Sequence, residues 1–315
     1  MNSDSTSQFA IFTTGLTKSF GSHNAVDGID LRVPRGSIFG FLGPNGSGKT
    51  TTIRMLLGLA NITQGEVSLL GEKVPDHIDR ALPKVGALVE GPAAYPYLSG
   101  RANLLRFDAA DKNADPKTRE SRVDQALARV GLTAAAGKKV NAYSLGMKQR
   151  LGIANALLQP RELLILDEPT NGLDPQGTRE VRNLIRSLSL EGITIFISSH
   201  LLVEIEQICT HLAVMSRGTI VAQGSVEELS ANESRVLTVG TVDQSLAIST
   251  LKAMGIEAVV DGLLVSAIVS DRAIKAEDVL KSLVDSKVAV SSFSLQAPTL
   301  EERFVLLTGE GFEVA

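Results

Sequence analysis

The sequence predicts an α/β protein with a parallel sheet, followed by a second and smaller α+β domain. Short apolar runs rich in β-branched residues recur along the chain, and stretches with helical periodicity lie between them. This alternation of strand and helix is typical of a parallel sheet. The length favours two domains, because 315 residues exceed the ~250–300 that one hydrophobic core usually holds.

Uncharged apolar runs predict the strands of the parallel sheet, since such strands are buried on both faces. These runs are Ile38–Leu42, Val85–Val89, Leu163–Leu166 and Ile193–Ser198. Other segments alternate in polarity, with turn signals such as Arg217-Gly218 between them. They are Phe9–Thr14, Val26–Val33, Val67–Leu70, Leu212–Met215 and Thr219–Ala222. We expect these segments to form an antiparallel β subdomain beside the parallel core.

Apolar residues spaced three or four apart predict helices between the strands. The helices expected are Thr50–Leu59, Leu145–Leu158, which Pro160 closes, and Thr178–Leu190. A short helix over Val226–Leu229 ends the first domain, which we place at residues 1–229.

A polar segment, Ser230–Ser234, is typical of a linker and begins the second domain, residues 230–315. The elements expected in it are, in order, strand Val236–Val239, helix Gln244–Met254, strands Ile256–Val260 and Leu263–Val269, helix Ala273–Ser286, strand Val288–Leu295 and helix Thr299–Leu307. Asp261-Gly262 predicts a hairpin between the two middle strands. The order β-α-β-β-α-β matches a small ferredoxin-like sandwich.

The composition is that of an ordinary globular chain. Hydrophobic residues make up 43% and charged residues 21%, which is too apolar for a disordered protein. The net charge of −4 argues against a nucleic-acid partner, because such binders usually carry a basic excess. The single cysteine, Cys209, excludes an internal disulfide and fits a reducing cytoplasm.

The sequence also predicts that the chain reaches a membrane only through a partner. A transmembrane helix needs about 20 mostly apolar residues, and the longest uncharged stretches, such as Gly36–Gly48, are shorter. The N-terminal Met1–Ser7 lacks the basic region of a secretion signal. We therefore expect a cytoplasmic location.

The segment Gly43-Pro44-Asn45-Gly46-Ser47-Gly48-Lys49-Thr50 matches the P-loop pattern G-x-x-x-x-G-K-[ST]. It follows a predicted strand and opens a predicted helix, which is the context that the pattern requires. Its glycines let successive N–H groups point at phosphate oxygens, and the helix N-terminus adds positive partial charge. We expect Lys49 to reach the β- and γ-phosphates of ATP and Thr50 to ligate Mg²⁺, with Thr51 also among the nucleotide-binding residues.

Two adjacent carboxylates, Asp167 and Glu168, follow the apolar run Leu163–Leu166. Ligand sites lie at the carboxyl ends of parallel strands, which is also where the P-loop is expected. We expect Asp167 to hold Mg²⁺, directly or through water, and Glu168 to orient or deprotonate the attacking water. An acidic loop after a strand is common by itself, but together with the P-loop it indicates nucleotide hydrolysis.

Further motifs follow in an order that resembles the ABC ATPases. Tyr143-Ser144-Leu145-Gly146-Met147-Lys148-Gln149-Arg150 is similar to the signature motif of that family, and Asn171-Gly172-Leu173-Asp174 is similar to its D-loop. His200 stands at the position of its switch histidine. The resemblance covers about residues 8–229. It implies the ABC type of P-loop NTPase fold, with a parallel core sheet, an antiparallel β subdomain and a helical subdomain.

The resemblance also implies a role for a second copy of the chain. Ser144 is an expected helix N-cap, where free N–H groups are presented, and Gly146 follows it. In the family these residues grip the γ-phosphate of the nucleotide on the opposite subunit. An ordinary cap is the competing interpretation of Ser144.

Two more roles come from the family order. His200 follows a predicted strand, and its family counterpart contacts the γ-phosphate and the attacking water, which makes it catalytic together with Lys49 and Glu168. Phe20, before Gly21, matches the aromatic that stacks on adenine. A hydrophobic loop residue is the competing interpretation of Phe20.

The chain departs from the family pattern in two places. The usual signature is Leu-Ser-Gly-Gly-Gln, but here Leu145 replaces the first glycine and Met147 replaces the glutamine. Glu90 stands where the family has a glutamine. Its carboxylate has three alternatives: it ligates Mg²⁺, faces the γ-phosphate and is repelled, or turns to solvent. We expect the ligand role, because the cation is often the largest local charge in such a site.

Two segments resemble those of bacitracin- and daunorubicin-type exporter ATPases. They are Glu90-Gly91-Pro92-Ala93-Ala94-Tyr95-Pro96-Tyr97-Leu98-Ser99-Gly100 and Pro298-Thr299-Leu300-Glu301-Glu302-Arg303-Phe304, the latter followed by Leu306-Leu307-Thr308-Gly309. The resemblance implies an exporter motor. Two copies would sandwich two ATP molecules and drive an integral-membrane permease from the inner face of the cell membrane.

Two other functions stay open at this point. One is an ABC ATPase without a membrane partner, acting in translation or DNA repair. The single P-loop argues against the translation type, and the short span from Lys49 to Asp167 has no room for the long coiled coil of the repair type. The other is an importer motor whose C-terminal domain senses substrate, which the β-α-β-β-α-β tail allows.

Overall fold

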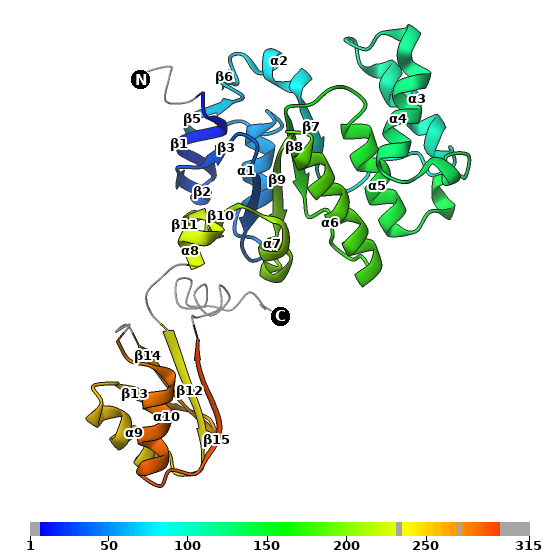
Figure 1. Ribbon diagram of the computed structural model, residues 1–315. Helices are drawn as coiled ribbons and strands as arrows, with labels where there is room; N and C mark the ends of the chain where they lie inside the picture. The colour runs from blue at the N-terminus through cyan, green and yellow to red at the C-terminus, as the bar shows by residue number, and fades with distance from the viewer. Residues whose placement is uncertain (1–6, 231–234, 270–272, 297–315) are drawn as a thin grey trace. The chain divides into compact units, whose positions relative to one another are not determined.

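Figure 1 shows the computed structural model, which describes residues 7–230, 235–269 and 273–296. The chain divides into two compact units, one that runs to Val226 and one that begins at Glu227. The division falls within the short helix α8 (Val226–Ser230). The expected boundary between residues 229 and 230 stays a prediction, and each unit is described by itself.

A six-stranded sheet forms the centre of the first unit. Its strands, in spatial order, are β11 (Thr219–Ser225), β10 (His211–Ser216), β4 (Ile38–Leu42), β9 (Thr194–Ser199), β8 (Leu163–Asp167) and β7 (Val85–Leu88). All neighbouring pairs are parallel except β10 and β11. The four uncharged runs therefore form parallel strands as expected. Every residue of β4, β8 and β9 is buried, because helices or the second sheet cover both faces.

The expectation that Leu212–Met215 and Thr219–Ala222 belong to the antiparallel subdomain is wrong. The first segment lies in β10, which pairs in parallel with β4, and the second lies in β11 at the edge of the same sheet. Leu212–Met215 is buried along its whole length, so it behaves as a core strand rather than as an alternating one. The hairpin itself forms as the turn signal indicates, with positive φ at Arg217 and Gly218.

A second, antiparallel sheet forms the expected β subdomain. Its strands are β1 (Phe9–Phe20), β2 (His23–Ile29), β3 (Arg32–Pro34), β5 (Gln64–Leu69) and β6 (Glu72–Val74). The expected strand Val26–Val33 is divided into β2 and β3, which pair with opposite ends of the long β1. β5 pairs with β1 on its other side, and β6 follows β5.

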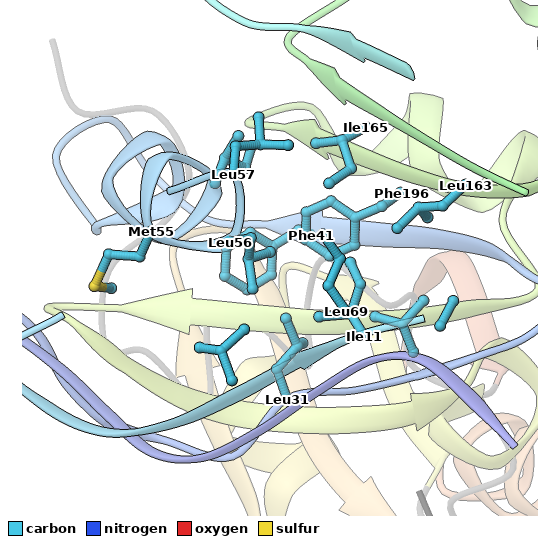
Figure 2. Packing of buried hydrophobic residues seen from close by; sticks show 14 of the residues in the cluster. Ile11, Leu31, Phe41, Met55, Leu56, Leu57, Leu69, Leu163, Ile165 and Phe196 are labelled. Carbon is cyan, nitrogen blue, oxygen red and sulfur yellow. The ribbon is translucent and has the colours of Figure 1, made fainter. Parts of the chain in front are cut away.

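The hydrophobic core of the first unit joins the two sheets to the helix that follows β4. Figure 2 shows Leu56 and Leu57 of this segment next to Phe41, Phe196 and side chains of the antiparallel sheet. The helix is α1 (Lys49–Leu56). Phe196 of β9 packs on two rings of the neighbouring strand β4: it stacks on Phe39, with ring centroids 5.8 Å apart, and is tilted against Phe41 at 5.3 Å. Burial of these rings fixes β4, β9 and α1 relative to one another.

The remaining helices cover the core sheet or gather at one end of the unit. α6 (Pro175–Leu190) and α7 (Leu202–Ile208) contact β9, and α7 also contacts β4. α3 (Gly100–Ala110), α4 (Arg119–Arg129) and α5 (Leu145–Ala156) form a helical group at the end of the unit beyond α6 (Figure 1). α2 (Ile78–Ala81) and 3-10 turns at Leu82–Lys84, Pro116–Thr118, Thr133–Ala135 and Val140–Ala142 connect these elements. Among the residues described, no helix is long and apolar enough to cross a bilayer.

The second unit has the element order expected for a ferredoxin-like sandwich. Its elements are β12 (Arg235–Thr241), α9 (Gln244–Ala253), β13 (Ala258–Asp261), β14 (Leu264–Val269), α10 (Ala276–Asp285) and β15 (Val290–Gln296). The antiparallel strands lie in the order β13, β14, β12, β15. Apolar residues of the sheet and of both helices form one core. The expected helix Thr299–Leu307 lies outside the described residues, as does most of the expected linker.

The aromatic cluster leads to a prediction about stability. Phe196→Ala removes a fully buried ring and should lower the free energy of unfolding by about 3–5 kcal/mol. Leu190→Ala is the control, because Leu190 is 90% exposed and its truncation should change stability by no more than about 0.5 kcal/mol. Urea unfolding followed by circular dichroism measures both. Equal midpoints for the two variants would contradict the central place of this cluster.

Candidate nucleotide-binding site

The predicted site residues of three segments meet at the carboxyl ends of β4, β8 and β9. These strands are neighbours in the core sheet. β4 leads into the P-loop Gly43–Gly48, β8 ends at Asp167 just before Glu168, and β9 ends just before His200. The parallel arrangement therefore brings the three loops to one edge of the sheet, as the sequence predicts.

The P-loop is held from outside by the β10–β11 hairpin and by β2. A Cβ on Gly43 would lie 2.3 Å from the carbonyl oxygen of Met215, so only glycine fits there. Gly48 precedes α1 with φ 106°, and a Cβ there would lie 2.4 Å from a carbonyl oxygen of β2. The Gly218 N–H of the hairpin donates to the Ser47 carbonyl at 3.0 Å. The shape of the loop thus depends on segments that precede and follow it in the chain.

Lys49 places its ammonium group at the mouth of the P-loop. Its Nζ donates to the carbonyls of Gly43 at 2.6 Å and Pro44 at 3.2 Å. Glu168 Oε1 lies 3.6 Å from the same nitrogen. Burial lowers the pKa of Lys49, and the negative charge of Glu168 acts in the opposite direction. The carboxylate therefore helps to keep a buried lysine charged.

Asp167 joins β8 to α1 and β9. Its Oδ2 accepts from the Thr50 hydroxyl at 3.0 Å, and its Oδ1 accepts from the Ser198 hydroxyl at 2.5 Å. The carboxylate is buried, so these bonds replace the water that an exposed group would have. The structure brings Thr50 and Asp167 together as expected for the residues that would hold Mg²⁺.

Glu168 lies between a lysine and a histidine. His200 Nδ1 is 2.8 Å from Glu168 Oε2, on the side away from the Lys49 contact at Oε1. The backbone of Glu168 has φ 49°, which is uncommon for a residue with a side chain and indicates local strain. Its N–H donates to Ser198 Oγ at 2.9 Å. The three residues predicted to be catalytic therefore form one contiguous group.

The signature residues lie at a different place in the fold. Ser144 is the N-cap of α5, as expected, and its hydroxyl accepts from the Met147 N–H at 3.2 Å. The neighbours of Gly146 are Gly177 and Leu173, at the N-terminus of α6. The contacts described for Ser144 and Gly146 are therefore with their own helix and with residues near the N-terminus of α6. The contacts of Lys49 are with the P-loop and with Glu168, directly after β8.

Phe20 and Glu90 lie on the surface. Phe20 ends β1 with its ring 58% exposed, and the Lys18 ammonium lies 4.9 Å from the ring centroid. Glu90 has φ 59° and forms an ion pair with Arg54 of α1. In the part of the chain that the structure describes, no three His, Cys, Asp or Glu side chains gather into a metal site, and the side-chain partner of Glu90 is Arg54.

Sequence reasoning missed Ser198 and Arg54. Ser198 contacts both Asp167 and the backbone of Glu168. Its position as a polar residue at the end of the apolar run Ile193–Ser198 is the available signal. Arg54 gave no such signal, because an arginine on a predicted helix is usually a solvated residue.

The residues present fit ATP with Mg²⁺. The oxygens of Thr50 and Asp167 are 3.0 Å apart, close to the ~2.9 Å between adjacent oxygen ligands of an octahedral Mg²⁺ with bonds of about 2.0–2.1 Å. Ser47 Oγ is buried without a hydrogen-bond partner among the described residues, in a loop shaped for phosphate. The lysine ammonium of the same loop supplies positive charge.

Comparison with known proteins identifies the family of the chain. The model of the ABC transporter family matches residues 26–171. The chain is 41% identical over 306 residues to the bacitracin transport ATP-binding protein BcrA of Bacillus licheniformis, covering 96% of this chain and 98% of that protein. It is 35% identical to the daunorubicin resistance ATP-binding protein DrrA3 of Streptomyces coeruleorubidus, covering 96% of each. The expected resemblance to bacitracin- and daunorubicin-type ATPases is confirmed.

Solved structures share the fold of the first unit. The chain is similar to cbiO1 of Clostridium perfringens, part of the ABC transporter complex cbiONQ, with a TM-score of 0.64, 28% identity, and coverage of 70% of this chain and 90% of that one. It is also similar to MJ1267, an ATP-binding cassette of an ABC transporter solved in its ADP conformation, with a TM-score of 0.63, 26% identity, and coverage of 70% and 92%. From its relatives, its fold and its P-loop, the chain belongs to the ABC transporter family as an ATP-binding subunit that hydrolyses ATP.

Proposed function

We propose that two copies of this chain close around two molecules of Mg-ATP and drive a membrane permease that exports its cargo. The observation that carries the proposal is that the predicted P-loop and signature residues make contacts with different parts of the chain. Lys49, Glu168 and His200 form one group, and the signature residues Ser144 and Gly146 contact the loop before α6 instead. Among the described residues neither Ser144 nor Gly146 contacts the P-loop group, so we infer that a second copy brings the nucleotide that they grip.

Gly146 supports this arrangement independently. Its φ is not positive, and a Cβ added to it would meet nothing closer than 3.7 Å, which is an ordinary contact. None of the described residues therefore requires a glycine here, and glycine weakens a helix relative to alanine by about 1 kcal/mol. A bulky γ-phosphate brought by another copy would explain why this position has no side chain.

The residues of the site divide the work of hydrolysis. Lys49 binds the β- and γ-phosphates, and Thr50 and Asp167 would hold Mg²⁺, which would neutralise charge on the phosphate oxygens. Glu168 orients a water for attack on the γ-phosphorus and accepts its proton as the bond to the ADP oxygen breaks. The contact with His200 fixes the direction of that carboxylate.

The permease contact is proposed at the loop before α3. Tyr97 is 64% exposed, and Tyr95 is exposed beside it, with ring centroids 6.0 Å apart. Asn103 is fully buried and holds the backbone of Tyr95 through its side chain, so the loop presents its aromatic rings from a fixed base. Exposed aromatic pairs suit a protein partner. Docking there would place the subunit on the cytoplasmic face of the cell membrane.

Export, rather than import, is proposed from the relatives. BcrA is named for bacitracin transport and DrrA3 for daunorubicin resistance, and both match nearly the whole chain. Cargo of the drug, peptide or antibiotic kind fits those names. The cargo would contact the permease and not this subunit.

Glu168→Gln should keep ATP binding and stop turnover. The amide has nearly the same shape but cannot accept the proton of the attacking water, so we expect kcat to fall by at least about a hundredfold. Lys49→Ala should instead lose binding or hydrolysis, because the phosphates lose their main cation. Glu162→Gln is the control, since Glu162 precedes β8 at its other end and pairs with Arg35. Steady-state ATPase and nucleotide-binding assays measure these effects, and parental turnover in Glu168→Gln would refute the assignment.

Gly146→Ala should separate the stability of the monomer from the assembly of the dimer. The methyl group fits within the chain and favours the helix, so thermal stability should stay equal or rise. ATP-dependent dimerisation of Glu168→Gln, measured by size-exclusion chromatography with light scattering, should be weakened when Gly146→Ala is added. The control is Gly152→Ala, whose Cβ would lie 2.7 Å from Leu88 and should destabilise the monomer itself. If Glu168→Gln dimerises equally well with and without Gly146→Ala, the proposed ATP sandwich of two copies is contradicted.

Glu90 is proposed to exchange Arg54 for Mg²⁺ when the nucleotide binds. Glu90→Ala should then raise the Mg²⁺ concentration needed for half-maximal hydrolysis, and Glu90→Gln should raise it less because one oxygen ligand remains. Arg54→Gln should lower it, since the competing cation is gone. Titration of Mg²⁺ at constant ATP measures all three. An unchanged Mg²⁺ requirement in every variant would leave Glu90 as a surface ion-pair partner only.

A further inference from the structure

Leu145 occupies the position of the first signature glycine, and its side chain lies beside a loop that glycine would not reach. It is the first residue of α5 and its side chain is 44% exposed. Its Cδ2 would lie 3.2 Å from a Cβ placed on Gly172, in the loop between β8 and α6. Gly172 has φ 72°, so a side chain there would be strained as well as crowded. The leucine side chain thus lies directly over the one backbone position of this loop that is free of a Cβ.

The loop under Leu145 begins at the proposed general base. The Asn171 N–H donates to the Glu168 carbonyl at 3.2 Å, and the Leu173 N–H donates to the Thr170 carbonyl at 3.1 Å. These consecutive turns connect Glu168 to Gly172 over a few residues, so a shift of Gly172 is transmitted to the backbone that carries the carboxylate. Strained backbone at Glu168 makes its side chain especially dependent on this support.

The far end of the loop is fixed to α6. Asp174 caps that helix, with its Oδ1 accepting from the Gly177 N–H at 2.8 Å. Gly177 in turn is a neighbour of Gly146, one residue after Leu145. The N-termini of α5 and α6 therefore approach through two glycines, and Leu145 covers the loop between them.

We propose that Leu145 is a positioning residue that joins the signature helix to the loop carrying Glu168 in the same chain. The inference rests on the proposed sandwich, in which Glu168 serves the nucleotide on its own P-loop and Ser144 and Gly146 serve the nucleotide of the other copy. The contact of Leu145 with Gly172 then connects the two ATP sites through a single chain. When the nucleotide of the second copy binds the signature, a shift of α5 would move Leu145 against the loop that follows Glu168. The general base of the first copy's own ATP site would then change its orientation.

The backbone gives no reason to prefer glycine at this position. The φ of Leu145 is not positive, so leucine is accommodated without strain, and it favours the helix more than glycine does. Leu145→Gly therefore restores the usual residue of the family and removes the side chain over the loop, at a small cost to the stability of α5 that thermal unfolding measures. If the signature worked through backbone freedom alone, this change would raise the rate of ATP hydrolysis. If the signature depends on Leu145, the change lowers that rate.

Leu145→Gly should lower kcat for ATP hydrolysis about tenfold and leave the KM for ATP within about twofold, because the phosphate-binding residues of the P-loop are untouched. Leu145→Met is the matched control, since it preserves volume and should retain at least about half of the parental kcat. Thermal unfolding checks that each variant is folded. Parental or faster turnover in Leu145→Gly would overturn the proposal, as would equal loss in Leu145→Met.

A double-mutant cycle tests the contact itself. Gly172→Ala should lower kcat both through strain at φ 72° and through collision with Leu145. Adding Leu145→Ala makes room for the new methyl group, so the double variant should be more active than the product of the two single effects predicts. Multiplicative effects would show that Leu145 and Gly172 act independently, and would refute the contact.

One further measurement separates failure of this inference from failure of the sandwich. The single variant Glu168→Gln and the double variant Glu168→Gln with Leu145→Gly should both form an ATP-dependent dimer. The proposed phosphate-binding residues Ser144 and Gly146 are unchanged in both. Absence of the dimer with Leu145 present would refute the sandwich and, with it, the connection between two sites. Formation of the dimer together with parental kcat in Leu145→Gly would refute the role of Leu145 alone.

Discussion

A buried carboxylate, Asp167, is the interaction on which the site depends. It lies at the end of β8 and accepts hydrogen bonds from Thr50 on α1 and from Ser198 on β9. A buried charge without partners would be costly, so these bonds fix the separation of three chain segments that are distant in sequence. The same Ser198 hydroxyl accepts from the N–H of Glu168 and sets the start of the next loop. The positions of the proposed Mg²⁺ ligands, of the proposed general base and of the two strands therefore depend on the same hydrogen bonds.

The fold could be predicted from sequence where a pattern had one interpretation. Uncharged runs such as Ile38–Leu42 are buried on both faces and lie in the core sheet, and the β-α-β-β-α-β order of the second unit follows from its periodicity and one hairpin signal. Leu212–Met215 was misassigned because a strand of four apolar residues beside a turn suits either sheet. Its partner β4 lies about 170 residues earlier in the chain, and local pattern carries no information about such pairing.

The sequence indicates which residues belong to the candidate site. It does not indicate most of the contacts that those residues make. The P-loop pattern and the acidic strand identified Lys49, Thr50, Asp167 and Glu168, and the parallel sheet brings them together. The pairing of Glu90 with Arg54 depends on how a loop folds back on α1, which no spacing rule specifies. The contact of Leu145 with Gly172 likewise arises from the approach of two helix N-termini, so the departure from the signature motif could be seen in the sequence but not interpreted there.

The β10–β11 hairpin determines how much of the chain is needed to build a working P-loop. Met215 closes over Gly43, and Gly218 bonds to Ser47, so a loop near the start of the chain is completed by residues that the ribosome adds about 170 positions later. The region matched by the family model ends at residue 171 and lacks this hairpin. During synthesis the phosphate cradle therefore stays unfinished until the last strands of the first unit have emerged. A shortened version meant to retain the cradle has to extend through β11.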